Sequence, residues 1–504
     1  MLKNKILALL LIITLNLSAH SHRYVPIDNH YNHFIEYQAL NSDSLSIFML
    51  TQPYKYQQIQ NLIDLPSDQN YLQNILTGCS LNFNDTAQSS IALDLAPGLM
   101  AYSDHKYQEL SRAIHLDGAI AIGGVTLANR IKLDQSVKYD PDFHGDSSEW
   151  LMGYLTNSYM NVSLNDNIDL FAGRLGRNFG IINDYGLLLS NNPYNFDHFG
   201  FRSRLNSMQY SFYFTRLNDM LGTDTQGSVI PIGQTINTHR YWAVQKFDWA
   251  IFPDLQISLA EATIYGGPNQ DFVAAYLNPV NFFYASQRNQ GYQMSGLWQI
   301  AGFYRPFQGI GLYLDLFADD LIANNESIDQ SGTMPRDVYP DRLGINAKIS
   351  MTDIFLSNTL TSLRYARIWN HTYTSFRNFE NYIYFNKSLG FPLNSYEGLK
   401  LSTTYFLHPA SLFSLSLEIW QHGNHTITEL FNGEKEEFPA KPVTYGLNID
   451  LYARTILFKK FEAEFAYTPV LTASQFRDIF TSPSIDHRLQ LKIYYHITPN
   501  FQNL

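Results

Sequence analysis

The chain has 504 residues but contains little cysteine and little charge. A single cysteine, Cys79, excludes an intramolecular disulfide and any metal site built from a cysteine cluster. Charged residues make up 16% of the chain, against roughly 25% in soluble domains. The net charge of −11 argues against the basic surface on which nucleic-acid binding depends. We therefore expect no nucleic-acid partner, and we expect neither a resident metal nor a cofactor.

Long apolar runs are also missing after the N-terminus. Lys3 and Lys5 precede the apolar run 6–15, and Ala19 provides a small residue at a cleavage point. These are the parts of a secretory signal peptide, which we predict over residues 1–19. The run is shorter than the about 20 apolar residues of a membrane-spanning helix, and no later stretch is long enough. A membrane role would therefore require strands.

Aromatic residues are abundant, with 34 Tyr, 34 Phe and 6 Trp. After about residue 88, segments of roughly 8–12 residues alternate between apolar and polar positions, with turn residues between them. Examples are 413–422, 443–454 and 488–497. The segment 310–320 places Ile310, Leu312, Leu314 and Leu316 on one face and Gly311, Tyr313, Asp315, Phe317 and Asp319 on the other.

This alternation favours strands that cross a bilayer, although a soluble sandwich would alternate too. Many segments reach about 10 residues, which is the length of a tilted membrane strand, and aromatic residues gather near their ends. In lipid the sheet must close, because an open edge would leave backbone groups unpaired. We predict an all-β, closed antiparallel transmembrane β-barrel over residues 88–504, in the bacterial outer membrane. Its length corresponds to about 18 strands, with 16 as the alternative.

The front of the chain has a different pattern. Residues 20–87 do not alternate, and the stretches 29–40 and 54–63 are typical of short helices. We predict a small helical domain that either lies in the periplasm or plugs the barrel. Its opening, Val25-Pro-Ile-Asp-Asn-His-Tyr, resembles an S-layer-homology module.

Three motif-bearing stretches lie within the predicted barrel. The first is Ala172-Gly-Arg-Leu-Gly-Arg-Asn-Phe-Gly with Leu187-Leu-Leu-Ser-Asn-Asn; the second is Glu261-Ala-Thr-Ile-Tyr-Gly-Gly with Tyr276-Leu-Asn-Pro-Val-Asn. The third is Leu363-Arg-Tyr-Ala-Arg-Ile-Trp with Lys387-Ser-Leu-Gly-Phe-Pro-Leu. Taken together, the three stretches resemble the Wzi family of outer-membrane capsule-assembly proteins. One departure is Gly180-Ile-Ile, where family members often have Gly-Pro-Gly. The resemblance implies an 18-stranded barrel that holds capsular polysaccharide at the cell surface as a lectin, with polysaccharide export machinery as a further partner.

Candidate sugar-binding residues follow from this resemblance and from chemistry. Sugars bind to flat apolar rings and to planar hydrogen-bonding groups, and acidic polymers also require Arg. Lumen-lining ladders and aromatic girdles are the competing interpretation of the same side chains. The first stretch supplies Arg174, Arg177, Asn178, Asn191, Asn192, Asn195 and Asp197. The second supplies Glu261, Tyr276, Asn278, Tyr284, Gln287, Arg288 and Trp298.

Glu261 shares a parity with the apolar Leu255, Ile257 and Leu259. Either a bulge near Ala260 turns the carboxylate inward, or the strand has already left the lipid at this point. The sequence leaves both readings open.

We interpret the chain as an outer-membrane barrel that binds or organises surface polysaccharide without covalent chemistry. Its expected partners are capsular or other surface polysaccharide and outer-membrane lipid, and we expect no enzyme activity. The alternative is a porin-like channel for saccharides or other small solutes. Conductance separates the two, because a barrel filled by its own loops passes little current.

Overall fold

The computed structural model describes residues 23–28, 30–60, 62, 89–145, 153–165, 167–221, 237–268, 270–290, 294–319, 342–408, 411–431, 436–458 and 460–497. The predicted signal peptide, residues 1–19, and Cys79 lie outside these ranges. No helix in the described ranges is both long and apolar enough to cross a membrane.

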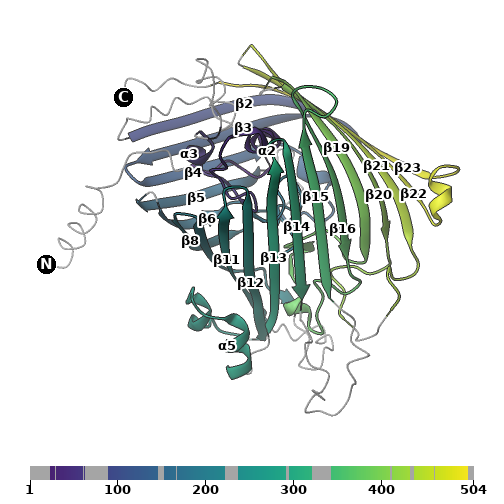
Figure 1. The fold of residues 1–504 in the computed structure, drawn as a ribbon. Coiled ribbons are helices and arrows are strands. Elements are labelled where there is room, and N and C mark those ends of the chain that lie inside the picture. The colour runs from purple at the N-terminus through teal and green to yellow at the C-terminus, as the bar shows by residue number, and fades with distance from the viewer. Residues whose placement is uncertain are drawn as a thin grey trace.

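Eighteen antiparallel strands form one closed barrel, which confirms the predicted fold class and strand number (Figure 1). Each strand pairs with the next along the chain, and the last pairs with the first. The two-residue strand β10 (Met220–Leu221) pairs with β11 in addition. The wall consists of β2 (Ser89–Ser103), β3 (Gln108–Ile122), β4 (Val125–Leu133), β5 (Gly153–Asn165), β6 (Ile168–Arg174), β8 (Asp197–Leu205), β9 (Met208–Arg216), β11 (Asn237–Phe252), β12 (Leu255–Pro268), β13 (Met294–Phe307), β14 (Ile310–Asp319), β15 (Leu343–Thr352), β16 (Thr359–Ile368), β19 (Tyr396–His408), β20 (Ser411–His422), β21 (Thr444–Leu457), β22 (Phe461–Ala473) and β23 (Ser484–Tyr495).

The closing pair, β2 with β23, is the shortest in the wall among the described residues. It contains six residue pairs, from Gly98 opposite Tyr494 to Ser103 opposite Leu489, whereas β2 and β3 share fifteen. The ladder stops next to Pro97, whose nitrogen has no hydrogen to donate. One isolated bridge, between Leu95 and Ile497, lies beyond it.

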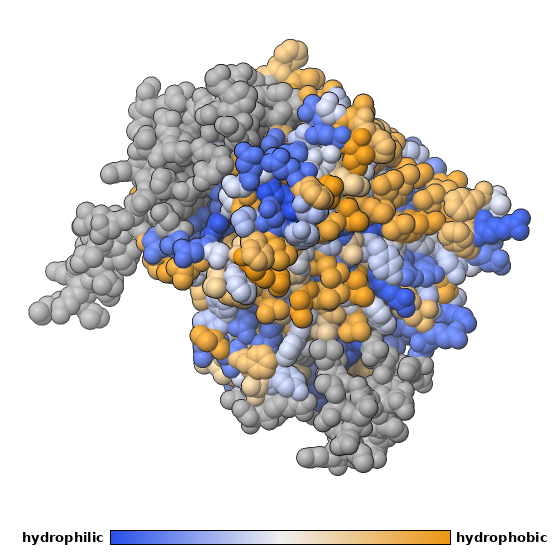
Figure 2. All heavy atoms as spheres, viewed as in Figure 1, coloured by the Kyte–Doolittle hydropathy of each residue, from blue (hydrophilic) through white to orange (hydrophobic). Residues whose placement is uncertain are grey.

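Every second side chain along a strand lies on the same face of the sheet, and the apolar set of side chains faces outward. On β14, Leu312, Leu314 and Leu316 are 36–44% exposed, whereas Tyr313 and Asp315 on the other parity are buried. Figure 2 shows hydrophobic side chains spread over the strand face in view. This arrangement places apolar groups against hydrocarbon and polar groups in the lumen.

The two ends of the barrel differ in their connections. At one end the strands are joined by short turns such as 123–124, 206–207 and 253–254; we call it the short-turn end. At the other, the long-loop end, the connections include 175–196, 269–293 and 369–395.

The described residues of the N-terminal segment, 23–28, 30–60 and 62, occupy the lumen, and we refer to them as the plug. They include α2 (Tyr31–Asn41), α3 (Tyr56–Gln60) and β1 (Thr51–Gln52), which pairs with β7 (Asn178–Phe179) of a loop. Figure 1 shows α2 and α3 within the ring of strands. The plug packs its apolar side chains against inward-facing residues of the wall, in a cluster that includes Ile35, Leu40, Met49, Phe303 and Tyr313.

Buried ion pairs attach the plug to the wall at several points around the ring. Glu36 of α2 lies 3.0 Å from Lys348 of β15 and also accepts hydrogen bonds from Ser350 and Asn183. Arg23 pairs with Asp117 of β3 at 2.6 Å, and Lys55 pairs with Asp169 of β6. Charges buried in a lumen cost free energy unless they are paired in this way.

Two long loops fold inward over the plug. Loop 175–196 buries Leu187, Leu188 and Leu189, whose exposed fractions are 2% or less. Loop 369–395 contains η4 (Asn378–Glu380), β17 (Ile383–Tyr384) and β18 (Lys387–Ser388). Its Tyr373 hydroxyl donates to the Leu187 carbonyl at 2.7 Å, and its Tyr382 hydroxyl donates to the Leu188 carbonyl at 2.8 Å. The two loops therefore form one buried layer above the plug.

Candidate functional site

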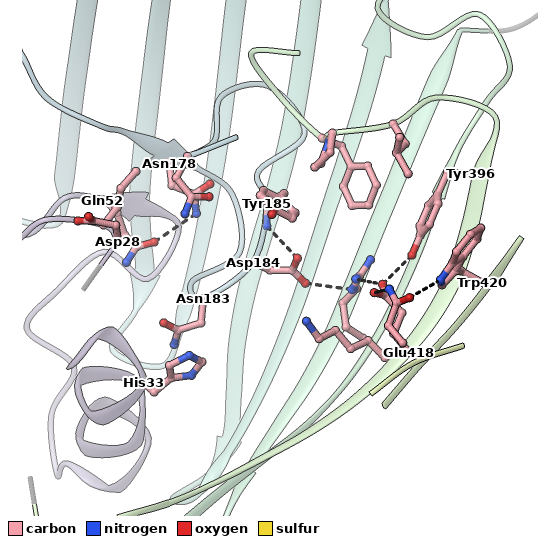
Figure 3. A pocket seen from close by; sticks show the side chains of 18 of the residues that line it. Asp28, His33, Gln52, Asn178, Asn183, Asp184, Tyr185, Tyr396, Glu418 and Trp420 are labelled. Carbon is pink, nitrogen blue, oxygen red and sulfur yellow. Dashed lines mark hydrogen bonds and ion pairs between the residues drawn. The ribbon is translucent and has the colours of Figure 1, made fainter. Parts of the chain in front are cut away.

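A cavity of about 450 Å³ lies between the plug, the two inward loops and the wall (Figure 3). This volume falls in the range of small-molecule sites. In Figure 3, His33 and Gln52 of the plug lie on one side, and Tyr396, Glu418 and Trp420 of the wall lie on the other. The cavity is lined by Ile27, Asp28, His30, His33, Gln52, Asn178, Asn183, Asp184, Tyr185, Asn191, Arg364, Phe391, Pro392, Leu393, Tyr396, Lys400, Glu418, Trp420 and Asn448.

Arg364 of β16 is the central charge of the cavity. Its Nη2 donates to Glu418 Oε1 at 2.6 Å, and its Nε lies 3.2 Å from Asp184 Oδ2. The Tyr396 hydroxyl donates to the same Glu418 oxygen at 2.6 Å. These contacts hold the guanidinium plane in one orientation. An Arg held in this way recognises planar oxygen groups directionally, because its donors already point in fixed directions.

Trp420 of β20 lines the cavity and is only partly buried. In the sheet it lies opposite Gly398 of β19 and Gly446 of β21. A Cβ on Gly446 would lie 2.2 Å from the indole ring, so only glycine allows the ring to lie there. The indole Nε1 donates to Asn448 Oδ1 at 3.0 Å, which sets the orientation of the ring.

Two cationic side chains retain free donor capacity. Arg364 Nη1 is buried and has no hydrogen-bond partner among the described residues. Lys400 of β19, which also lines the cavity, makes no ion pair with another described residue. A ligand that carries hydroxyl or carboxylate oxygens would satisfy both groups.

Two plug histidines that line the cavity are held neutral. Burial lowers the pKa of His30 to about 4 and that of His33 to about 3. His30 stacks on Tyr452, with ring centroids 4.0 Å apart. At neutral pH these rings therefore supply flat, uncharged surfaces to the cavity.

Their lowered pKa values make the plugged state sensitive to acid. An unfolded His titrates near 6.5, so below that pH the unfolded chain binds protons that the folded chain does not. We expect the midpoint of thermal unfolding to fall progressively from pH 6.5 towards pH 3, and the double variant H30N/H33Q to show a smaller fall. The exposed His487 gives the matched control, and H487N should follow the wild-type profile. Identical profiles for all three proteins would contradict the assignment.

The first predicted group of sugar-binding residues divides between different places. Asn178 and Asn191 line the cavity. Arg174 and Asp197 form an ion pair with Arg174 Nε and Asp197 Oδ1 3.0 Å apart, away from the cavity lining. Asn192 donates to the carbonyl of Ser388 in loop 369–395, and Asn195 donates to the carbonyl of Thr156 in β5.

Arg177, of the same group, lies in a buried aromatic cage. Its guanidinium carbon is 3.6 Å from the ring centroid of Tyr213 and 4.4 Å from that of Phe171. Its Nε donates to His198 Nε2 at 2.7 Å. Burial lowers the pKa of Arg177. This position lies outside the cavity.

The second predicted group lies on the outside of the wall. The ladder between β11 and β12 runs without a shift through Ala260 and Glu261, so no bulge is present and Glu261 faces outward. Loop 269–293 covers its carboxylate. Tyr276 is buried there against Tyr265, and Asn278 accepts from the Val280 amide. Tyr284 and Trp298 meet edge to face with centroids 6.0 Å apart. Gln287 and Arg288 belong to α5 (Phe283–Gln290) of this loop.

Most of the cavity residues were not among the predicted site residues, although signals for some existed. Arg364, Phe391 and Leu393 belong to the third family-like stretch. Glu418 and Trp420 lie on the polar parity of the segment 413–422. For the plug residues Asp28, His30, His33 and Gln52, no local pattern indicated the lumen.

The fold and the apolar outer face define a bacterial outer-membrane β-barrel. In such barrels short turns face the periplasm and long loops face the exterior, so the long-loop end is extracellular. The structure of Wzi from Escherichia coli, an outer-membrane protein involved in group 1 capsule assembly and a carbohydrate-binding β-barrel, is similar to this chain. It matches with a TM-score of 0.60 and 11% identity over 93% of this chain and 98% of that one.

At this identity the match establishes a Wzi-like fold. Pseudomonas aeruginosa OccD3 (OpdP) matches less well, with a TM-score of 0.47 and 12% identity over 82% of this chain and 92% of that one. No family model and no curated protein sequence matches the chain.

Proposed function

We propose that this barrel binds surface polysaccharide at the outer face of the cell, as a lectin without covalent chemistry. The observation that carries the proposal is the lumenal cavity, which combines the Trp420 face with the fixed Arg364 guanidinium and the carboxylates of Asp184 and Glu418. Aromatic faces stack on pyranose rings, and planar polar groups pair with sugar hydroxyls.

The filled lumen supports a binding role over a channel role. The plug and two inward loops occupy the interior with buried side chains and buried ion pairs. A barrel large enough to contain water conducts only when loops do not fill it. The Wzi-like fold is compatible with this proposal.

The test uses the full-length protein purified in detergent. Fluorescence titration with surface polysaccharide from the bacterium that makes this protein should give saturable binding. The same protein in a planar bilayer should pass almost no current. A steady ohmic conductance without polysaccharide binding would overturn the proposal in favour of a porin-like channel. Turnover of the polysaccharide would also overturn it.

A further inference from the structure

In loop 269–293, the described residues 270–290 fold outward against the wall of the barrel instead of into the lumen. Figure 1 shows its helix α5 beside the ends of β11 and β12. Glu261 of β12 accepts hydrogen bonds from the first two amides of α5, Phe283 at 3.1 Å and Tyr284 at 3.0 Å. A carboxylate at this place satisfies the free amides and the positive end of the helix dipole.

Two further outward-facing polar side chains hold the loop. Gln245 of β11 donates to Glu261 at 2.8 Å and to the Asn281 carbonyl at 2.9 Å. The Tyr210 hydroxyl of β9 donates to Gln245 Oε1 at 2.8 Å and also contacts the Pro279 carbonyl. The polar groups on this part of the outer face are thus used to anchor the loop.

A groove of about 580 Å³ lies under this anchored segment, on the outer face of the barrel. Phe282 of the loop and Trp298 of β13 form its aromatic side, with ring centroids 5.4 Å apart. The side chains that face outward into it from five neighbouring strands are Phe247, Leu259, Glu261, Ile300, Leu316 and Ile345. Several of them, including Leu259 at 50% and Ile300 at 55%, remain exposed in the groove.

We infer that this groove binds one acyl chain of lipid A in the outer leaflet. The groove is continuous with the lipid-facing surface of the barrel, because its floor consists of the same outward parity that contacts hydrocarbon. Its only outward carboxylate, Glu261, is already bonded to three donors, so an apolar occupant leaves no charge unpaired. The loop that roofs it belongs to the extracellular end, which places the groove in the outer leaflet.

The ring of Phe282 makes the groove different from the rest of the lipid-facing wall. An acyl chain on a smooth barrel wall contacts protein on one side only, whereas a chain in the groove contacts the wall and the ring of Phe282. The additional apolar area that is buried on both sides of the chain lengthens the residence of the bound lipid.

Native mass spectrometry of the full-length protein, purified in mild detergent and supplied with lipid A or phosphatidylethanolamine, tests the inference. We expect one retained lipid A per wild-type barrel. I300W fills the groove and F282A removes its roof, and each should lower retention at least tenfold. L363W places the same large ring on the exposed outer face of β16, away from the groove, and should retain lipid as wild type does.

Equal retention by I300W, F282A and L363W would overturn the inference, as would equal retention of phosphatidylethanolamine and lipid A by the wild type. The shift of the folded band on unheated gels shows whether each variant has formed its barrel. A second variant, E261A, releases the start of α5 without altering the apolar lining, and it should also lower retention.

Discussion

Replacing Glu36 with alanine is expected to release the plug and open the lumen to ions. Glu36 is fully buried, and the change leaves the Lys348 ammonium buried without its carboxylate. Removing one partner of a buried ion pair costs about 3–5 kcal/mol, which corresponds to an increase of about 150- to 5,000-fold in the population with the plug released. Planar-bilayer recordings of E36A should show frequent openings where the wild type is almost silent.

Two variants make this result specific to the buried pair. E36A/K348A removes both charges and should recover much of the wild-type behaviour, because the unpaired ammonium causes most of the penalty. E437A breaks an exposed ion pair, in which Lys441 Nζ lies 2.7 Å from Glu437 Oε2. This variant should leave the current unchanged. An E36A protein as silent as the wild type would show that the plug does not depend on this pair.

Replacing Trp420 with alanine is expected to weaken polysaccharide binding about 30-fold. The change removes the aromatic face of the cavity, and the loss of one central aromatic contact costs about 2 kcal/mol in many binding sites. The barrel itself should remain folded, since Trp420 lies on the lumenal side and is only partly buried. Titration of W420A with the polysaccharide that binds the wild type measures the effect.

Matched variants separate the loss of the ring from a general effect. Trp249 of β11 faces outward and is 41% exposed, so W249A removes the same side chain from the lipid side and should bind as the wild type does. G446A keeps the indole but displaces it, because its Cβ would lie 2.2 Å from the ring, and it should also reduce affinity. Wild-type affinity in both W420A and G446A would exclude this cavity as the polysaccharide site.

The barrel could be predicted from the sequence because its signal is local. Alternation along 310–320 assigns each side chain to a face, and the free energy of burying Leu312 in lipid and Asp315 in the lumen acts in the same direction. Segment length and chain length then gave the number of strands. None of these steps required knowledge of a contact between distant residues.

Glu261 shows where this local argument stopped. Parity alone placed its carboxylate outward, which conflicts with lipid unless another segment covers it. The covering groups are the amides of Phe283 and Tyr284, more than twenty positions later in the chain. A helix that turns back onto the outer wall has no signature in the strand that it covers.

The cavity could be predicted only in part for the same reason. Its inward side chains Glu418 and Trp420 follow from alternation, whereas its other side comes from the plug. Whether His33 faces the lumen depends on the Glu36–Lys348 pair, which joins residues more than three hundred positions apart. The sequence therefore left open whether the front segment plugs the barrel or lies in the periplasm.

The short ladder between Gly98–Ser103 and Leu489–Tyr494 bears on the order in which the molecule is assembled. The ring is complete only when its first and last strands meet, and that joint has the shortest continuous ladder of the described wall. Closure of the ring therefore depends on the pair of strands that share the shortest continuous ladder. Mechanical pulling on the finished protein should unzip the same joint first.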